Sequence, residues 1–209
     1  MNGGLDSGIT VAPRRAAGRL RRAYGDSAVF DLTSKGPEPW IRFSPFFPHG
    51  GIPVPFWPGI TASSVEGIWQ GLKRFEFENE VDVAKFSITT LGNIKRSSRA
   101  RGRNGVPRGR VLGHQLGARP SLIDYMTARV VLYLPTYRWI LDHRLQQETA
   151  TLREASKHGG IFLLDYSTND DLRDTSQPLS HAALVRWYLL GSWPADQIDV
   201  EKLCEAGPK

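Results

Sequence analysis

The sequence contains very little cysteine. Its 209 residues include a single one, Cys204, which excludes an internal disulfide bond and a cysteine-based zinc site. The five histidines show neither the HxxxH nor the HExxH spacing that places two metal ligands on one helix face, so the sequence predicts no metal site. Because disulfide-free chains suit reducing compartments, we expect a cytoplasmic location.

Long apolar segments are also missing. No run approaches the roughly 20 residues that a membrane-spanning helix needs, and residues 1–13 lack the apolar core of a secretory signal. There is no glycine-rich dinucleotide turn, so we expect no redox cofactor. The remaining composition, with 40% hydrophobic and 23% charged residues, is that of an ordinary soluble domain with its own core.

Positive charge is concentrated in two segments. The formal net charge is +6, yet residues 95–110 alone hold seven lysines and arginines and no acid. Five more arginines lie within 14–22, so the rest of the chain carries a net charge of −6. Such segments attract phosphate-rich partners. We expect Arg99, Arg101 and Arg103 to bind phosphate without contributing to the fold, and a loop that is only solvated is the alternative.

The order of predicted elements indicates an α+β fold, dominated by helices, with a few short strands in a single compact domain. The apolar residues of 28–36 and 161–167 are typical of strands. Residues 1–25 are predicted to form a flexible basic arm, followed by one domain over 26–209. Helices are predicted for four segments: 63–75, Ser121 to a break at Pro135, 136–157, and the segment that follows the N-cap Ser180.

Residues 40–59 combine five prolines with many aromatic side chains, which excludes a regular helix. Disordered linkers are not built from aromatic residues. We therefore interpret this segment as an ordered, extended loop that packs on the core or lines a pocket.

The stretch SSVEGIWQGLKRF, residues 63–75, is predicted to be a helix with Ser63 as its N-cap and Glu66 completing a capping box. One face is apolar, and the opposite face carries Glu66, Gln70 and Lys73. This polar face is either a solvated surface or part of a pocket.

Two glycines, Gly67 and Gly71, interrupt the same predicted helix, although each costs about 1 kcal/mol relative to alanine in a helix interior. They lie together on one flank of the polar face. We interpret them as sites where another group, either backbone or ligand, comes close to the helix.

The segments FSPFFP (43–48) and SVEGIWQGLKRF (64–75) resemble the signature of the NADAR, or YbiA-like, family. In that family an FSNFYP-like segment precedes an S-x-E-x-x-x-Q-x-x-K-F helix. The serine, glutamate, glutamine and lysine of the motif match at the same spacing, and the aromatic residue after the lysine is shifted by one position. These four matching residues are Ser64, Glu66, Gln70 and Lys73.

The resemblance implies a compact, mostly helical fold and N-glycosidase activity on the bond between a ribose C1′ and a nitrogen. Family substrates include ribosylamino-pyrimidine intermediates and ADP-ribose adducts on guanine. Glu66 would stabilise an oxocarbenium-like sugar or activate water. Lys73 would bind phosphate, bind the leaving base or attack C1′ as a nucleophile, and Gln70 would orient the ribose or the base. No metal or other cofactor is implied.

Further candidates come from the aromatic loop and from the segment after 161–167. Phe47 and Trp69 would stack on the base, and His49 would donate a hydrogen bond to the substrate. Asp165 is the candidate second carboxylate, with a turn-forming role as the alternative, and Asn169 is a candidate substrate contact.

A second hypothesis is a non-enzymatic protein that binds nucleic acid through 95–110. In this case the polar face of the helix would be only surface. The two hypotheses also combine, as an enzyme acting on nucleotides within DNA. The expected partners are therefore a nucleotide or an ADP-ribosylated base, with DNA as a possible polymer substrate and no membrane.

Overall fold

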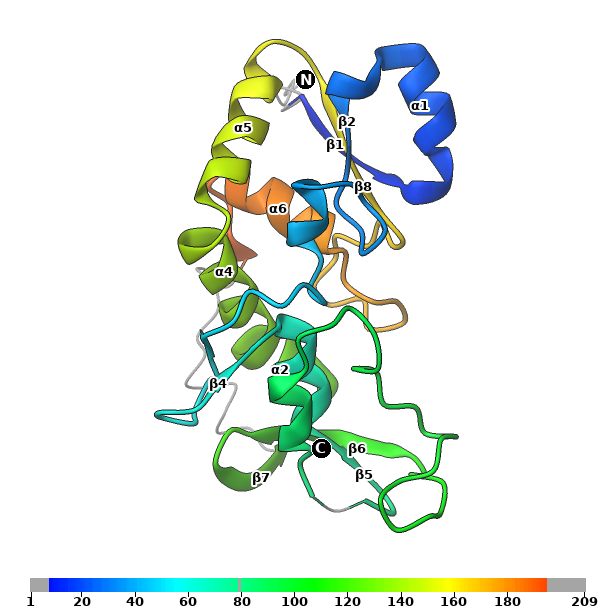
Figure 1. The fold of residues 1–209 in the computed structure, drawn as a ribbon, viewed down its shortest axis with the longest axis vertical. Helices are drawn as coiled ribbons and strands as arrows, with labels where there is room; N and C mark the ends of the chain where they lie inside the picture. Colours follow the sequence, from blue (N-terminus) through cyan, green and yellow to red (C-terminus); the bar gives the residue numbers. More distant parts are fainter. Residues whose placement is uncertain (1–7, 79, 195–209) are drawn as a thin grey trace. The chain divides into compact units, whose positions relative to one another are not determined.

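The structure, a computed structural model, describes residues 8–78 and 80–194 of the chain (Figure 1). About 38% of the protein is helix and about 18% is strand. The predicted mixed α+β class, with helix predominating, is therefore confirmed. Cys204 lies outside the described residues.

The described residues divide into two compact units. The first unit combines 8–44 with 141–194, and the second unit covers 45–140. The prediction of one domain over 26–209 stays a prediction. Alternating apolar patterns predict elements, but they do not reveal which elements share a core.

A parallel three-stranded sheet organises the first unit. Its strand order is β1 (Ile9–Pro13), β8 (Ile161–Asp165) and β2 (Val29–Asp31). The two strands predicted within 28–36 and 161–167 are confirmed. The first four residues of β8 are apolar, as expected for the central strand of a parallel sheet.

The predicted basic arm is wrong for residues 9–24. This stretch forms β1, the 3₁₀ turn η1 (Arg14–Ala16) and helix α1 (Ala17–Tyr24). Leu20 of α1 packs into a small apolar cluster with three sheet residues, Ala12, Val29 and Leu164. Arg19 and Arg22 of α1 are exposed, whereas Arg14 of η1 pairs with the buried Asp31 of β2 at 2.9 Å.

Three longer helices follow one another before and after β8: α4 (Leu134–His143), α5 (Gln146–Lys157) and α6 (His181–Leu189). The helix predicted over 136–157 is two helices. The predicted N-cap Ser180 is confirmed, since its Oγ accepts a hydrogen bond from the Ala183 amide at 3.2 Å. A further 3₁₀ turn, η2 (Asp26–Ala28), leads into β2, and η3 (Trp40–Phe43) follows it.

An antiparallel three-stranded sheet lies in the second unit: β5 (Lys73–Phe75), β6 (Val111–Leu116) and β7 (Arg119–Ile123). The helix predicted from Ser121 therefore begins too early, because β7 occupies that position. Asp124 is the N-cap of the short helix α3 (Tyr125–Ala128).

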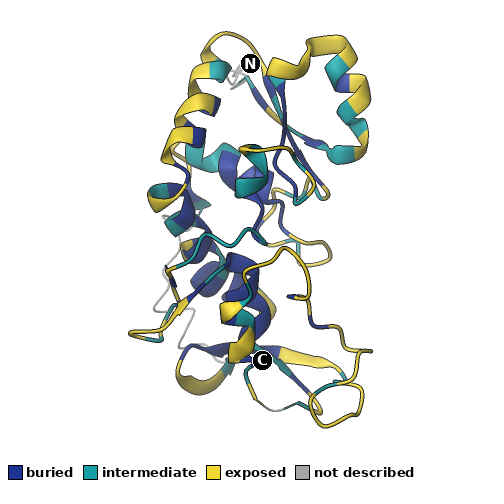
Figure 2. Ribbon diagram, in the orientation of Figure 1, coloured by how far each residue is buried: buried dark blue, intermediate teal, exposed yellow. Residues whose placement is uncertain are grey.

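The remaining elements of the second unit are short. They are the strand pair β3 (Ile52–Pro53) and β4 (Thr61–Ala62), helix α2 (Val65–Gly71), the 3₁₀ turn η4 (Val83–Ser87) and a π-helical turn over Arg129–Tyr133. The last runs directly into α4, so Pro135 does not end the helix as predicted. Every residue of α2 is buried (Figure 2).

A buried ion pair joins the end of β8 to the first turn of α6. The Asp165 carboxylate lies 2.9 Å from Nδ1 of His181 and accepts a hydrogen bond from the Ser180 hydroxyl at 2.8 Å. The Nε2 atom of His181 lies 2.9 Å from the Leu32 carbonyl oxygen. With an acceptor at each ring nitrogen, the protonated imidazolium is the form that satisfies the site.

The pKa values of this pair move in opposite directions. Burial acts to lower the pKa of His181, but Asp165 and the Leu32 carbonyl raise it above the ordinary 6.5. Burial acts to raise the pKa of Asp165, but His181, Ser180 and the Tyr166 amide lower it below the ordinary 3.8. Both charged forms are therefore stabilised by folding.

We predict that this pair contributes most to stability between about pH 3.8 and pH 6.5. The contribution from His181 is complete below its unfolded pKa and is lost as pH rises through its raised folded pKa. The contribution from Asp165 is complete above its unfolded pKa and is lost as pH falls through its lowered folded pKa. Denaturant unfolding across pH 4–9 should show the free energy of unfolding declining above about pH 6.5.

Asp165→Asn should lower that free energy by about 3–5 kcal/mol near pH 6 and remove the decline at higher pH, because it breaks a buried pair. Glu154→Gln is the matched control, since Glu154 pairs with His158 on an exposed helix surface. No measurable change is expected for the control. An Asp165→Asn protein with the wild-type pH profile would contradict this account.

Candidate functional site

Helix α2 begins one residue later than predicted. Ser64, not Ser63, is the N-cap, and its Oγ accepts a hydrogen bond from the Gly67 amide at 3.0 Å. The Glu66 amide donates instead to the Pro45 carbonyl at 2.8 Å. With Ser64 as N-cap, the third helical residue is Gly67, so the predicted capping box with Glu66 is wrong.

The helix also ends earlier than predicted, at Gly71. Lys73 already belongs to β5, where it pairs directly with His114 of β6 in antiparallel register. The prediction that Lys73 lies on a helix reaching Phe75 is therefore wrong. The direction of the Lys73 side chain is therefore determined by the change from helix to strand at Leu72, and not by helical spacing.

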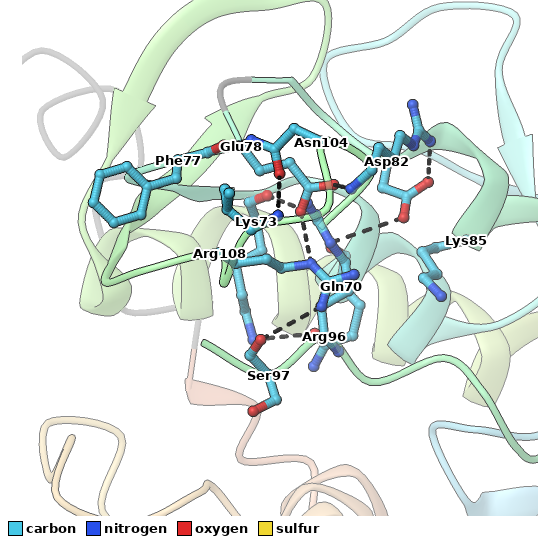
Figure 3. A network of polar contacts seen from close by, with 12 residues as sticks. Gln70, Lys73, Phe77, Glu78, Asp82, Lys85, Arg96, Ser97, Asn104 and Arg108 are labelled. Atoms are coloured by element: carbon cyan, nitrogen blue, oxygen red, sulfur yellow. Dashed lines mark hydrogen bonds and ion pairs between the residues drawn. The ribbon is translucent and has the colours of Figure 1, made fainter. Parts of the chain in front are cut away.

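The three polar residues nevertheless form one hydrogen-bonded chain. Gln70 donates from Nε2 to Oε1 of Glu66 at 2.8 Å, and Lys73 donates from Nζ to Oε1 of Gln70 at 3.2 Å (Figure 3 shows Gln70 and Lys73). Glu66 is 8% exposed and Gln70 is 5% exposed. The alternative of a solvated polar face is therefore wrong. A pocket in front of Glu66 and Lys73 stays a prediction.

The pKa values of the two ends of this chain shift toward each other. Burial raises the pKa of Glu66, against the Gln70 hydrogen bond and the charges of Lys73 and Lys95. Burial lowers the pKa of Lys73, helped by Arg96 and Lys95 and opposed by Glu66. Opposite shifts in one hydrogen-bonded chain ease proton exchange between its ends and are typical of functional sites.

Trp69 is packed into the protein rather than left open for a base. It is 9% exposed, and the ring centroid of His114 lies 3.9 Å from its own. The rings of Tyr125 and Tyr133 meet it edge-on at 5.4 and 5.6 Å. The predicted stacking of a substrate on Trp69 is corrected to stacking inside the core.

His114 is a residue of this region that the sequence did not single out. It is fully buried, and neither ring nitrogen has a hydrogen-bond partner among the described residues. Burial, together with the charge of Lys73, lowers the pKa of His114 to about 3, so the ring is neutral. Its only sequence signal is a histidine within a predominantly apolar strand, which does not distinguish it from ordinary core packing.

The two glycines of α2 make room for η4. A Cβ atom at Gly67 would lie 2.6 Å from the Lys85 carbonyl oxygen, and one at Gly71 would overlap the Phe86 ring. The interpretation that another group comes close to the helix at these glycines is thus confirmed. The groups that come close are the backbone of the chain itself and a phenylalanine ring. The sequence could not distinguish these groups from a ligand.

The basic segment 95–110 is partly structural, contrary to the expectation that it contributes nothing to the fold. Arg96 is buried and pairs with Glu78 at 3.0 Å, and Arg108 pairs with the same carboxylate at 2.6 Å (Figure 3). Five other cations remain exposed: Lys95, Arg99, Arg101, Arg103 and Arg110.

The predicted phosphate-binding arginines differ in how far they are already engaged. Arg103 pairs with Asp82, which competes with phosphate. Arg101 donates to the Gly105 carbonyl within the loop. The Arg99 amide donates to Ser97 Oγ at 3.3 Å, which leaves its guanidinium outside that contact.

The candidates of the aromatic loop lie in the same unit as Glu66. Phe47 and His49 are half-buried, with ring centroids 4.9 Å apart. The ammonium group of Lys95 lies over the neighbouring Phe46 ring, 5.4 Å from its centroid. Their interaction with substrate stays a prediction.

Asp165 and Asn169 belong to the first unit and have structural partners there. Asp165 forms the buried pair with His181, and its role as a second catalytic carboxylate stays a prediction. The amide of Asn169 donates to the Asp174 carbonyl at 3.1 Å, and its Oδ1 accepts from the Asp171 amide at 3.0 Å. These bonds shape the loop before α6.

A family model described as a family of unknown function (DUF6939) matches residues 12–185, well over half of the chain. The chain belongs to DUF6939. No curated protein and no solved structure matches it. The NADAR resemblance therefore stays a prediction.

The described residues of this DUF6939 protein contain no group of three or more histidine, cysteine, aspartate or glutamate side chains placed to hold a metal. Within the same part of the chain, no helix is both long and apolar enough to cross a membrane.

We predict that alanine at either glycine of α2 destabilises the protein, although helix propensity alone would stabilise it by about 1 kcal/mol. Both substitutions should cost stability, because the added Cβ would meet the Lys85 carbonyl at Gly67, and the buried Phe86 ring and the Asp82 carbonyl at Gly71. Gly18→Ala in α1 is the control, since only the end of a flexible arginine lies near its Cβ. Denaturant unfolding should show losses of about 1–3 kcal/mol for overpacking at α2 and a small gain at Gly18. A gain at all three positions would refute the packing argument.

Proposed function

We propose that the second unit of this DUF6939 protein is an N-glycosidase that hydrolyses the bond between ribose C1′ and a base nitrogen in a ribosylated or ADP-ribosylated nucleobase. The observation that carries the proposal is the buried chain Glu66–Gln70–Lys73, whose ends have oppositely shifted pKa values. The match of Ser64, Glu66, Gln70 and Lys73 to the NADAR motif supports it.

In the proposed reaction the bond between C1′ and the base nitrogen breaks, and its electron pair leaves with the base. Positive charge develops on C1′ and the ring oxygen, and the Glu66 carboxylate stabilises it. The oxygen of a water molecule forms the new bond to C1′. Glu66 receives the proton that this water loses and then gives it up to solvent, while the leaving base takes up one proton from solvent. Because burial raises the pKa of Glu66, its carboxylate is a stronger base for this step than an exposed glutamate.

Lys73 offers a covalent route to the same products. A lowered pKa increases the fraction of neutral amine, which is the nucleophilic form. Attack on C1′ expels the base with its bonding pair, and opening of the sugar ring then leaves a Schiff base. Water hydrolyses that intermediate, which restores the amine and releases the sugar. If the lysine only binds phosphate, no covalent intermediate forms.

We predict that Glu66→Gln reduces turnover on an ADP-ribosylated guanine by about 100-fold or more in the presence of a chelator, because it removes the charge that faces the oxocarbenium ion. Glu80→Gln is the control, since Glu80 is an exposed acid of the same unit. Release of free guanine, followed by chromatography, measures the rate. A Glu66→Gln enzyme as active as the control would place the chemistry elsewhere.

Lys73→Ala should be as damaging as Glu66→Gln if the lysine is the nucleophile, and milder if it only binds phosphate. Borohydride added during turnover should leave the sugar attached to the peptide that contains Lys73, as mass spectrometry can show. The Lys73→Ala protein should not be labelled there. Turnover without any trapped adduct would favour direct attack by water.

Nucleic-acid binding is the second candidate function, and the five exposed cations of 95–110 are the observation in its favour. The segment is held in place at Arg96 and Arg108, so the exposed cations project from a fixed base. A positively charged loop of this kind binds phosphate backbones without reading sequence.

We predict that the double substitution of Arg99 and Arg101 by glutamine leaves the melting temperature nearly unchanged and weakens DNA binding in a salt-dependent way. The slope of log affinity against log salt should become shallower by about 0.9 for each phosphate that the loop no longer neutralises. Arg108→Gln is the contrasting variant and should lower the melting temperature, because Arg108 pairs with the largely buried Glu78 carboxylate. Unchanged binding of the double variant at low salt would reject this function.

A further inference from the structure

Arg96 of the basic segment forms hydrogen bonds with residues of the candidate site. A phosphate-binding role of the segment would not require these bonds. The Arg96 guanidinium is fully buried, and Nη1 donates to the main-chain carbonyls of Gln70 and Lys73 at 2.9 and 2.8 Å. Its own amide donates to Oε1 of Gln70 at 3.0 Å. The guanidinium also lies over the Phe75 ring, 4.8 Å from its centroid.

These hydrogen bonds decide which way the Gln70 amide points. Two donors, the Arg96 amide and the Lys73 ammonium, converge on the same end of the Gln70 side chain. That end must be the oxygen, because an NH₂ group accepts no hydrogen bond. The NH₂ end is therefore directed to Glu66, where it donates at 2.8 Å.

The charge of Arg96 acts on the same lysine. The groups that face Lys73 are Glu66 of α2, His114 of β6, and Lys95 and Arg96 of the basic segment. Glu66 favours the ammonium form, His114 is neutral, and the two cations favour the neutral amine. Lys95 is exposed and therefore screened by solvent, whereas Arg96 is not.

We propose that Arg96 is a positioning residue of this site, which holds the Gln70 amide and the Lys73 main chain so that Gln70 links the lysine amine to the Glu66 carboxylate. This catalytic meaning rests on the proposed N-glycosidase function. The structural claim does not, because it concerns only the state of Lys73 and Gln70 in the free protein.

Competitive acetylation of the protein with acetic anhydride tests the claim without any substrate. Peptide mass spectrometry across pH 6–11 reports the labelling midpoint of each lysine, with the exposed Lys35 as an internal reference. Below its midpoint, the labelling rate of Lys73 falls about tenfold for each unit by which its pKa rises. We expect Arg96→Gln to slow labelling of Lys73 at pH 8 by about threefold or more, and to leave Lys35 unchanged.

Arg108→Gln is the matched control. Arg108 shares the Glu78 carboxylate with Arg96, but among the described residues its hydrogen bonds go to Glu78 and Ser97 rather than to Gln70 or Lys73. Near-wild-type labelling of Lys73 in Arg108→Gln supports the proposal. An equal effect in both variants, or none in folded Arg96→Gln, overturns it.

If Arg96→Gln does not fold, Arg96→Lys decides the question by NMR. This variant keeps the charge but removes the forked donor geometry. The side-chain amide resonances of Gln70 should move in Arg96→Lys and stay in place in Arg108→Gln, and unmoved resonances in Arg96→Lys overturn the proposal. Neither experiment measures glycosidase activity. A failure of the proposed function can therefore be distinguished from a failure of the positioning role of Arg96.

Discussion

The candidate site of the second unit depends on the interactions of one fully buried group, the guanidinium of Arg96. A buried charge costs several kcal/mol unless its donors are satisfied and its charge is compensated. Two main-chain carbonyls and the Glu78 carboxylate accept hydrogen bonds from the terminal nitrogens, and the guanidinium lies over the face of Phe75. The Asp82 carboxylate adds charge compensation 3.8 Å from Nε, which makes no hydrogen bond among the described residues. The same interactions tie the end of α2, the start of β5 and the basic segment to one point, although the basic segment lies far from the other two in the sequence.

Close packing around α2 is the second constraint. Gly67 and Gly71 allow η4 to approach the helix, which shields that flank of α2 from water. Glu66 and Gln70 are consequently buried beside the apolar residues of their own helix. Burial is the largest cause of the shifted pKa values of Glu66 and Lys73.

The two buried acidic clusters differ in how completely they are satisfied. In the first unit, Asp165 and His181 find partners for every polar atom that they direct inward, which is typical of an ion pair that stabilises a fold. In the second unit, Glu66 has a raised pKa, and neither nitrogen of the neighbouring His114 has a partner among the described residues. A buried histidine without a hydrogen-bond partner, next to Lys73 in the sheet, is a feature that supports the proposed function of the second unit.

The sequence by itself determined the local features: the strand within 28–36, the strand within 161–167, the N-cap Ser180 and the mixed α+β class. Each depends on residues close together in the chain, such as an apolar run or a capping serine. It also selected Glu66, Gln70 and Lys73 as one group, through a motif spacing that survives the change from helix to strand at Leu72. Only the tertiary structure decided that this group is buried, that Trp69 packs on His114 and that Arg96 is structural, because burial and charge pairing depend on which distant segments meet.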